Sequence, residues 1–480
     1  MSGHMTPEQF RAYGHAVVDW VADYWTALAE QPQRFPVRAQ VEPGSVAAAL
    51  PEAPPEKGEP LPEILADLDR IVLPATTHWQ HPSFFAYFPA NTSGPSVLGD
   101  LVSAGLGTQG MLWSTGPACT ELETVTLDWL AQLLGLPDRF RSSGPGGGVI
   151  QDSTSSATLV ATLAALHRAS GGRWREHGVD GRYTVYTSTE GHSSIEKAAR
   201  IAGLGNGAVR LVEVDEVRAM RPDALRARIE ADVAAGYVPA LVVATIGTTS
   251  TTAVDPLPQI GPVCRQYGAW LHVDAAYAGA AAVCPELRWS HAGLEYADSY
   301  CMDPHKWLLT GFDCNAFWVA DRAGLVDALT VLPEYLRDAA SASGAVIDYR
   351  DWQVPLGRRF RALKLWFVLR WYGAEGLRAH VRAGVELAAR FADLVRGDRR
   401  FEIVAPHPFS LVCFRLAAPD EVNEELLRRV NASGELFLTH TRVDGRFVLR
   451  LAVGSPYTGP AHIDAAWRRL RDTASDLVGG

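Results

Sequence analysis

The sequence predicts an α/β protein with a mostly parallel central sheet that is covered by helices on both faces. The first observation is that short apolar runs alternate with helical patterns through the middle of the chain. Nearly continuous apolar runs of this kind are typical of strands buried on both faces. They predict strands at residues 148–151, 184–187, 208–214, 240–246, 269–274 and 316–319. The patterns between them predict helices, among them residues 157–170, 194–202 and 222–235.

The second observation concerns the beginning of the chain. A helix is predicted to begin at Pro7, because Thr6 can cap it and Gln9 completes a capping box. An apolar stripe follows at helical spacing, and it consists of Phe10, Tyr13, Val17, Val21, Tyr24 and Leu28. This stripe fits packing on its own domain and packing on a partner subunit equally well. The stretch at 31–63 is rich in Pro, Glu and Ala and predicts an extended connector.

The third observation is a change of pattern after residue 356. A long helix predicted at 359–372 leads to another helix and then to strand patterns at 410–415 and 447–452, which suits a small α/β domain. We therefore expect three parts. They are a dimer-forming, wrapping helical segment over residues 1–90, a large cofactor-binding domain over 91–370 and a small domain over 371–480.

Composition excludes several classes of partner. The chain has 480 residues and a net charge of −10, which argues against nucleic acid or an anionic membrane as its main partner. We find neither a signal peptide nor an apolar stretch long enough for a membrane span. The six cysteines are scattered without metal-ligand spacing, so we expect buried free thiols and a cytoplasmic protein.

Two separate segments predict a cofactor that carries an aldehyde. Lys306 follows a Pro-His pair and precedes an apolar Trp-Leu-Leu run, and partial burial makes the neutral amine that attacks aldehydes easier to reach. Upstream, an apolar run ends at Asp274 and small residues follow. A single lysine is usually a solvated charge, and Asp274 alone could simply cap a helix. Together they indicate pyridoxal 5'-phosphate, which needs an amine for its aldehyde and an acid for its ring nitrogen.

Further candidates lie at the ends of predicted strands. Thr245 ends one strand as Asp274 ends another, so both are expected to face one crevice beyond the carboxyl ends of the strands. The hydroxyls of Ser153, Thr154 and Ser155 open a predicted helix, whose N–H groups suit a phosphate. The glycine run at 146–148 is a weak signal by itself, because such runs are more often plain loops.

Two candidates for catalysis lie in polar segments. His192, in a turn after a predicted strand, could stack on the cofactor ring or only form local hydrogen bonds. Tyr335 precedes a small polar stretch, so it could deliver a proton from a lid or be a surface tyrosine. His78 and His81 are too sparse a signal for a zinc site, and we expect no metal.

At this point the chain resembles the pyridoxal-phosphate-dependent aromatic-L-amino-acid decarboxylases, the group II decarboxylases, from Phe10 to about Trp467. The resemblance depends on six motifs: His-Trp at 78–79 with Phe-Phe-Ala-Tyr-Phe-Pro at 84–89, Pro-Ala-Cys-Thr-Glu-Leu-Glu at 117–123, Gly-Val-Ile-Gln at 148–151, His-Val-Asp-Ala-Ala-Tyr-Ala-Gly at 272–279, Pro-His-Lys-Trp-Leu-Leu at 304–309 and Pro-Leu-Gly-Arg-Arg-Phe at 355–360. It implies the type I, aspartate aminotransferase-like fold and an obligate homodimer with active sites at the subunit interface. The N-terminal helix would then pack on the partner.

The resemblance also implies a role for individual residues. Lys306 would hold the cofactor, Asp274 its ring nitrogen, and His192 would stack over the ring. Ser153, Thr154 and Ser155 would hold the phosphate, and Tyr335 would protonate the substrate carbon. The rest of the cofactor contacts would come from Thr245, Ala276 and His305. The pocket for the substrate side chain would be lined by Trp79, Tyr87, Phe88 and Pro89.

The chain departs from the family at several positions. Asp303 stands where many relatives have an asparagine near the phosphate, and an acid there would repel the phosphate unless it is neutralised or turned away. Ala90 replaces a small hydroxyl residue of animal relatives. Gln109 and Met111 stand where animal relatives carry apolar and aromatic pocket residues from the partner subunit. Gly357 leaves room where some plant tyrosine-type relatives carry serine, and this additional space favours a substrate with an indole ring.

The expected reaction is decarboxylation of an aromatic L-amino acid (tryptophan, 5-hydroxytryptophan, tyrosine, DOPA or phenylalanine) to an arylethylamine. An aromatic acetaldehyde synthase is the alternative. In this family that outcome accompanies loss of the lid tyrosine or of the stacking histidine, and both Tyr335 and His192 are present. An aminotransferase would need a basic clamp for the carboxylate and a second substrate. A non-catalytic scaffold with this fold is the remaining alternative.

Overall fold

The computed structural model describes residues 4–331 and 346–478, and the chain divides into two compact units. The larger unit comprises Ala90–Glu386 and Ala405–Leu411. The smaller unit comprises Met1–Pro89, Leu387–Val404 and Val412–Gly480. The expected division of the chain at residues 90 and 370 stays a prediction.

The larger unit is built on a seven-stranded sheet with the order β1-β7-β6-β5-β4-β2-β3. Its strands are β1 (Gly147–Gln151), β2 (Tyr183–Ser188), β3 (Val209–Val212), β4 (Val238–Thr245), β5 (Trp270–Asp274), β6 (Ser299–Met302) and β7 (Asn315–Val319). The five strands from β6 to β3 run parallel, and β7 runs antiparallel to both of its neighbours, β6 and β1. The predicted α/β class with a mostly parallel sheet is therefore confirmed.

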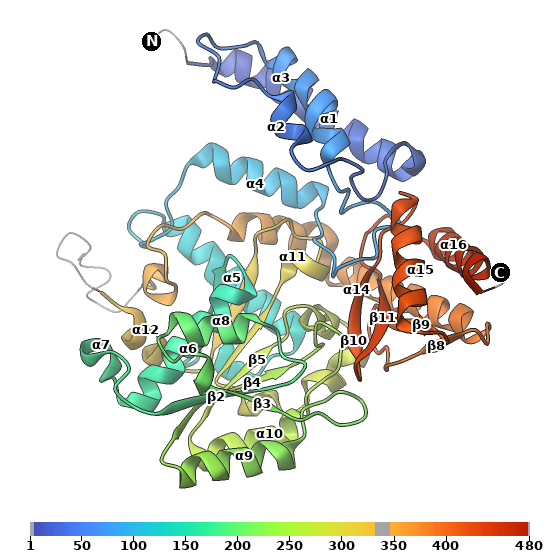
Figure 1. Ribbon diagram of the computed structural model, residues 1–480. Helices are drawn as coiled ribbons and strands as arrows, with labels where there is room; N and C mark the ends of the chain where they lie inside the picture. The colour runs from blue at the N-terminus through green and yellow to red at the C-terminus, as the bar shows by residue number, and fades with distance from the viewer. Residues whose placement is uncertain (1–3, 332–345, 479–480) are drawn as a thin grey trace. The chain divides into compact units, whose positions relative to one another are not determined.

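Helices cover this sheet because its strands are apolar on both faces, as β4 shows with seven of its eight residues buried. The helices of the larger unit are α4 (Gly94–Leu106), α5 (Pro117–Leu134), α6 (Thr154–Ser170), α7 (Trp174–His177), α8 (Ser194–Ile201), α9 (Pro222–Ala234), α10 (Leu257–Tyr267), α11 (Pro304–Trp307) and α12 (Arg322–Leu329). Helix α6 packs along β4, β5 and β6, and its alanines share a core with Leu241 and Val243. Helices α9 and α10 lie side by side and pack against β4 (Figure 1).

In the larger unit the predicted strands all occur, with ends shifted by at most two residues, but β6 was missed. It has only four residues and is preceded by the short 3-10 turn Leu294–Tyr296, so the sequence gives it little length and no clear start. The predicted helix after residue 356 also occurs. Helix α14 (Ala362–Arg396) is interrupted at Gly373, which has a φ of 59°, so the predicted succession of two helices is confirmed.

The smaller unit joins the beginning and the end of the chain. Its four-stranded sheet has the order β10-β11-β9-β8, with β8 (Phe401–Ile403), β9 (Leu411–Leu416), β10 (Thr439–Val443) and β11 (Arg446–Ala452). Helices α15 (Asp420–Ala432) and α16 (Pro460–Val478) contribute to its core. Phe85 belongs to the same core, and its backbone N–H donates to the carbonyl of Phe437.

The N-terminal helix α1 (Pro7–Glu30) begins as predicted. The Gln9 N–H donates to the Thr6 hydroxyl at 3.2 Å, and the Thr6 N–H donates to the Gln9 side chain at 2.9 Å. The apolar stripe is buried only at Leu28, whereas Phe10 is exposed. The predicted extended connector contains the short helix α2 (Ser45–Ala49) and the start of α3 (Leu61–Asp67), so it is not extended throughout.

All six cysteines are free and buried, as predicted. Over the part of the chain that the structure describes, no helix combines the length and the apolar character needed to cross a bilayer.

Candidate active site

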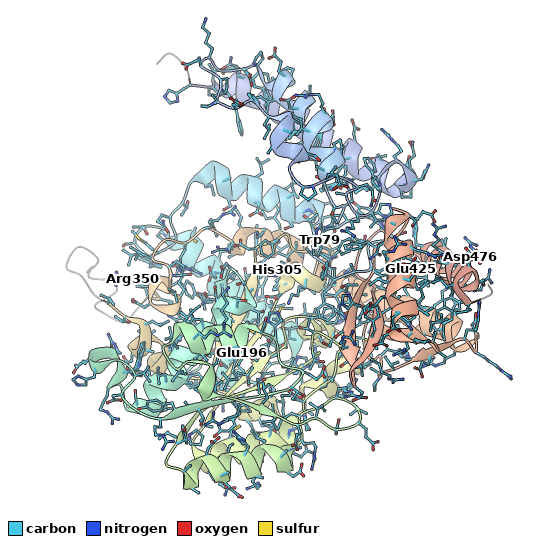
Figure 2. All side chains as sticks on the ribbon, in the orientation of Figure 1. Trp79, Glu196, His305, Arg350, Glu425 and Asp476 are labelled. Atoms are coloured by element: carbon cyan, nitrogen blue, oxygen red, sulfur yellow. The ribbon has the colours of Figure 1, made fainter. Side chains whose placement is uncertain are left out.

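The site residues meet at one edge of the larger unit's sheet. Thr245 ends β4 and Asp274 ends β5, and the two residues are register partners in adjacent parallel strands. Lys306 lies on the short helix α11, which follows β6, and in Figure 2 His305 marks this helix. Ser153 caps α6, two residues after the end of β1. The carboxyl ends of parallel strands therefore gather these groups, as the sequence predicts.

Lys306 is ion-paired at the centre of this edge. Its Nζ lies 2.9 Å from Oδ2 of Asp303, and the Asp303 side chain is only 2% exposed. The same Oδ2 accepts a hydrogen bond from the Thr154 hydroxyl at 2.9 Å, and Oδ1 accepts one from the Asn315 amide at 2.7 Å. Burial alone would raise the pKa of Asp303, but the cation of Lys306, the charge of His305 and the Asn315 amide lower it. The charge of Asp303, which was expected to repel a phosphate, is thus neutralised by neighbouring residues.

Asp274 is a buried carboxylate with a local backbone contact. Its Oδ1 accepts the Ala276 N–H at 3.0 Å. The next helical element is the 3-10 helix Ala278–Val283, whose N-cap is Tyr277, so Asp274 does not cap it. Burial raises the pKa of Asp274, while Lys306, the Ala276 N–H and His192 act in the opposite direction. A cationic ring N–H placed against Asp274 would keep this carboxylate ionised.

The predicted phosphate residues do not play equal parts. Ser153 accepts the Ser156 N–H at 3.4 Å and so caps α6, and Ser155 is exposed. Thr154 is buried and its hydroxyl is taken up by Asp303, which differs from the prediction that all three side chains face a phosphate. The helix start and the two serines remain the donors suited to an anion.

The glycine run next to this helix has a packing role. A Cβ at Gly148 would lie 2.7 Å from the indole nitrogen of Trp318, closer than side chains tolerate. Close packing on the neighbouring strand requires glycine at this position. The glycine run therefore has a structural role, and it is not evidence for phosphate binding.

The remaining predicted cofactor residues also lie at this edge. His192 is exposed in the turn after β2, and its Nδ1 lies 2.9 Å from the Ser194 hydroxyl. His305 is buried; its Nδ1 accepts the Cys314 N–H at 3.0 Å, and burial lowers its pKa. The Ala276 carbonyl accepts the Asp303 N–H.

These residues fit pyridoxal 5'-phosphate. The Thr245 Oγ1 is buried and has no hydrogen-bond partner among the described residues, as expected of a group that serves a ligand. Thr245 is the register partner of Asp274, a buried acid whose pKa is raised by burial and lowered in part by the charge of Lys306. The start of α6 supplies anion donors. Amine, acid and phosphate donors are the three groups that this cofactor requires.

The predicted aromatic residues gather in the smaller unit. The rings of Trp79 and Tyr87 are stacked with centroids 5.7 Å apart, and both side chains are exposed. The Arg450 guanidinium lies 5.5 Å from the Phe88 ring centre, and Pro89 packs closely on Gly454. Their role in binding substrate stays a prediction.

Gln109, Met111 and Gly357 lie together in the larger unit. The Gln109 Oε1 accepts the Arg358 N–H at 2.7 Å, and a Cβ at Gly357 would lie 3.2 Å from the Gln109 Nε2. The Met111 carbonyl accepts the Arg350 N–H at 3.1 Å. The pairing of Gln109 with Gly357 places two predicted specificity residues in contact distance.

A buried ion pair anchors this segment to β1. Arg358 reaches both oxygens of Glu123, at 2.6 and 3.1 Å, and donates to the Ile150 carbonyl at 3.0 Å. The Ile150 N–H donates to Glu123 at 2.8 Å. The two residues lie in two of the sequence motifs, but the pair itself could not be predicted, because 235 positions separate its members.

Two further polar residues were missed. Asn315 starts β7 and bridges Asp303 and Thr154, and a buried amide at the head of an apolar strand was the available signal. Asp255 accepts the backbone N–H of Thr245 and of Met220, both at 2.7 Å, and so holds the end of β4. Tyr335 lies outside the described residues. Within them, no group of three or more His, Cys, Asp and Glu side chains is arranged to hold a metal.

Comparison with known proteins now decides the family. Residues 43–417 match the model of the pyridoxal-dependent decarboxylase conserved domain. The chain belongs to this family of decarboxylases. It is therefore a carboxy-lyase, its cofactor is pyridoxal 5'-phosphate, and the expected type I fold is confirmed.

Relatives match the decarboxylase over nearly its whole length. Tryptophan decarboxylase 2 of Oryza sativa subsp. japonica is 45% identical over 486 residues, which covers 99% of this chain and 96% of the relative. Phenylacetaldehyde synthase of Arabidopsis thaliana is 47% identical over 485 residues, which covers 99% and 97%. The crystal structure of Oryza sativa TDC with PLP and tryptamine is 41% identical and superimposes with a TM-score of 0.95, covering 99% of this chain and 100% of that one.

Proposed function

We propose that this decarboxylase converts an aromatic L-amino acid, tryptophan first among the candidates, to its arylethylamine and CO2. The observation that carries the proposal is the meeting of Lys306, Asp274 and Thr245 at one sheet edge, in a chain 45% identical to a tryptophan decarboxylase. Gly357 beside Gln109 supports a large flat side chain, because a bare glycine leaves room there.

When bound, pyridoxal 5'-phosphate accepts the electrons that the departing carboxylate leaves on the substrate carbon. Asp274 supports this by holding a negative charge against the ring nitrogen. Lys306 must present a neutral amine, and we assign to His192 the role of stacking over the ring or of moving a proton. We assign the proton that replaces the carboxylate to Tyr335.

The test is a panel of tryptophan, 5-hydroxytryptophan, tyrosine, DOPA and phenylalanine with amine and CO2 both quantified. The proposal expects equal amounts of the two, with the highest kcat/KM for an indole substrate. A Tyr335→Phe variant should lose amine formation but keep bound cofactor. The matched control is Tyr267→Phe, whose hydroxyl lies 2.9 Å from Glu230 on the surface and should leave turnover unchanged. Unchanged turnover in Tyr335→Phe would remove this proton donor.

The alternative function is that of an aromatic acetaldehyde synthase, and the 47% identity to phenylacetaldehyde synthase is the observation that favours it. That reaction consumes O2 and water and releases CO2, ammonia, hydrogen peroxide and the aldehyde. Peroxide and ammonia in amounts equal to CO2 would establish it, and amine equal to CO2 would exclude it.

We also propose a cytoplasmic homodimer with shared active sites. Support comes from apolar side chains that remain exposed on α4 and α14, namely Leu98, Leu101, Leu106 and Trp371. Leu98 and Trp371 line a hollow of about 500 Å³ together with Trp366, Phe367 and Arg370. Exposed apolar patches of this kind mark association sites. The six free, buried thiols fit a reducing compartment. Light scattering should give twice the chain mass of 52.0 kDa, and a single-chain mass would contradict the dimer.

A further inference from the structure

The ion pair between Lys306 and Asp303 gives the cofactor lysine a resident partner. The Nζ of Lys306 is 2.9 Å from Oδ2 of Asp303. The carboxylate is 2% exposed, whereas the lysine side chain keeps 29% of its surface. The acid is therefore fixed in the protein, and the lysine is the member that can turn toward a ligand.

Three other segments hold Asp303 in place, two through its carboxylate and one through its backbone. Thr154 at the start of α6 donates to Oδ2, and Asn315 at the start of β7 donates to Oδ1. The backbone N–H of Asp303 donates to the Ala276 carbonyl after β5. With these bonds made, Asp303 does not need to move when Lys306 leaves.

The surrounding charges favour the same arrangement. The titratable groups that act on the pair from every packed element are Asp274 after β5, Cys301 on β6, His305 on α11 and, through Asp274, His192 after β2. Burial alone would lower the pKa of Lys306, but the attraction of Asp303 and Asp274 outweighs it and raises that pKa. His305 Nε2 lies 3.6 Å from Asp303, and burial lowers its pKa, so it is a weak competitor for the carboxylate.

We propose that Asp303 is a positioning residue that holds Lys306 as an ammonium ion in the cofactor-free protein, so that cofactor loading requires this ion pair to open and Lys306 to release a proton. An ammonium has no lone pair, and only the neutral amine can bind an aldehyde. Asparagine at this position would offer the same hydrogen-bond acceptor without the charge. The proposal rests on the cofactor of the family and not on the identity of the amino acid substrate.

The test measures the rate at which pyridoxal 5'-phosphate binds to cofactor-free protein, by absorbance, at a series of pH values without substrate. The loading rate of the wild type should rise with pH, because neutral Lys306 becomes more abundant. In Asp303→Asn the midpoint of this rise should fall by about 1–3 pH units, the usual effect of one close opposite charge. At neutral pH this variant should therefore load about tenfold faster or more.

The matched control is Asp100→Asn. Asp100 lies 3.0 Å from the Nζ of Lys364, another buried lysine, and neither residue contacts Lys306 or Asp303 in any described hydrogen bond or ion pair. This control should keep the wild-type pH profile. Superimposable profiles for Asp303→Asn and the wild type, or an equal shift in the control, would overturn the proposal.

A second measurement needs no variant. Competitive acetylation of cofactor-free wild type over a pH series, with peptide mass spectrometry, gives the pH at which Lys306 becomes nucleophilic. The proposal expects a midpoint above the ordinary lysine value of about 10.4. A midpoint below that value would overturn it even if Asp303→Asn did not fold. Failure of either measurement would leave the decarboxylation proposal standing, because neither measures turnover.

Discussion

Glu123→Gln removes the charge from the buried ion pair that fixes the segment around Gly357. Glu123 is 0% exposed and the Arg358 side chain is 1% exposed, so water cannot take the place of either partner when the other is removed. Glutamine keeps one oxygen for the Ile150 N–H but turns an N–H₂ group toward the guanidinium. The oxygen that accepts the Ile150 N–H also accepts from Nη2 of Arg358, so that bond remains but loses its charge, and the bond from Nη1 is lost. Arg358 would then keep only neutral acceptors, namely this amide oxygen, the Ile150 carbonyl and the Gln353 Oε1.

The expected cost follows from this burial. Removing one partner of a buried ion pair typically lowers stability by about 3–5 kcal/mol, because the other charge stays buried without compensation. We expect the free energy of unfolding of the larger unit to fall by that amount. The loop with Gln109 should also lose its hold, since its Oε1 is bonded to the Arg358 N–H.

The assay is urea denaturation followed by circular dichroism, with cofactor absorbance as the second probe. Glu286→Gln is the control, because Glu286 pairs with Arg382 at 2.6 Å with both side chains about half exposed, and its loss should not move the midpoint. A loss below about 1 kcal/mol in Glu123→Gln would refute the reasoning, since that is the range of an exposed pair.

Two further predictions concern a pH dependence and substrate choice. Burial raises the pKa of Asp255 from 3.8 to about 6 despite its two backbone N–H donors, so the folded state binds this proton more tightly than the unfolded state. The stability that this proton contributes is present in full below about pH 4 and is lost as pH rises to about 6, a change of about 3 kcal/mol. In Asp255→Asn the plot of unfolding free energy against pH should be flatter over this range. Parallel plots for the variant and the wild type would contradict the raised pKa. In Gly357→Ser, the new Cβ would lie 3.2 Å from Gln109 Nε2 and narrow the space, so kcat/KM for an indole substrate should fall about tenfold or more relative to a phenol substrate. Gly357→Ala distinguishes the effect of side-chain volume from that of the serine hydroxyl. An unchanged ratio of kcat/KM for indole and phenol substrates in both variants would exclude a role of Gly357 in specificity.

The sequence predicted the parts of the site that local pattern encodes. Thr245 and Asp274 were found because each ends an apolar strand, and Lys306 because polar residues precede an apolar run. Such signals need only a few neighbouring residues. The confirmed start of α1 at Thr6 is of the same kind.

The rest depends on residues that are distant along the chain. The sequence identified Asp303 as an unusual acid but not the hydroxyl donor that helps to hold it, because Thr154 lies 149 positions away. Phe85 belongs to a sequence motif, yet its place in the core and its backbone bond to Phe437 depend on pairing between distant parts of the chain. A single sequence does not record which distant segments pair, so these features required three-dimensional information.

The six buried thiols allow unfolding of the protein to be followed by thiol labelling. Burial raises the pKa values of Cys119, Cys264 and Cys314 to about 12, so at neutral pH these sulfurs are both hidden and protonated. A thiol-specific dye should therefore label folded molecules very slowly and denatured ones at all six positions. Counting dye per chain would follow transient opening of either unit during storage or heating, without any engineered probe.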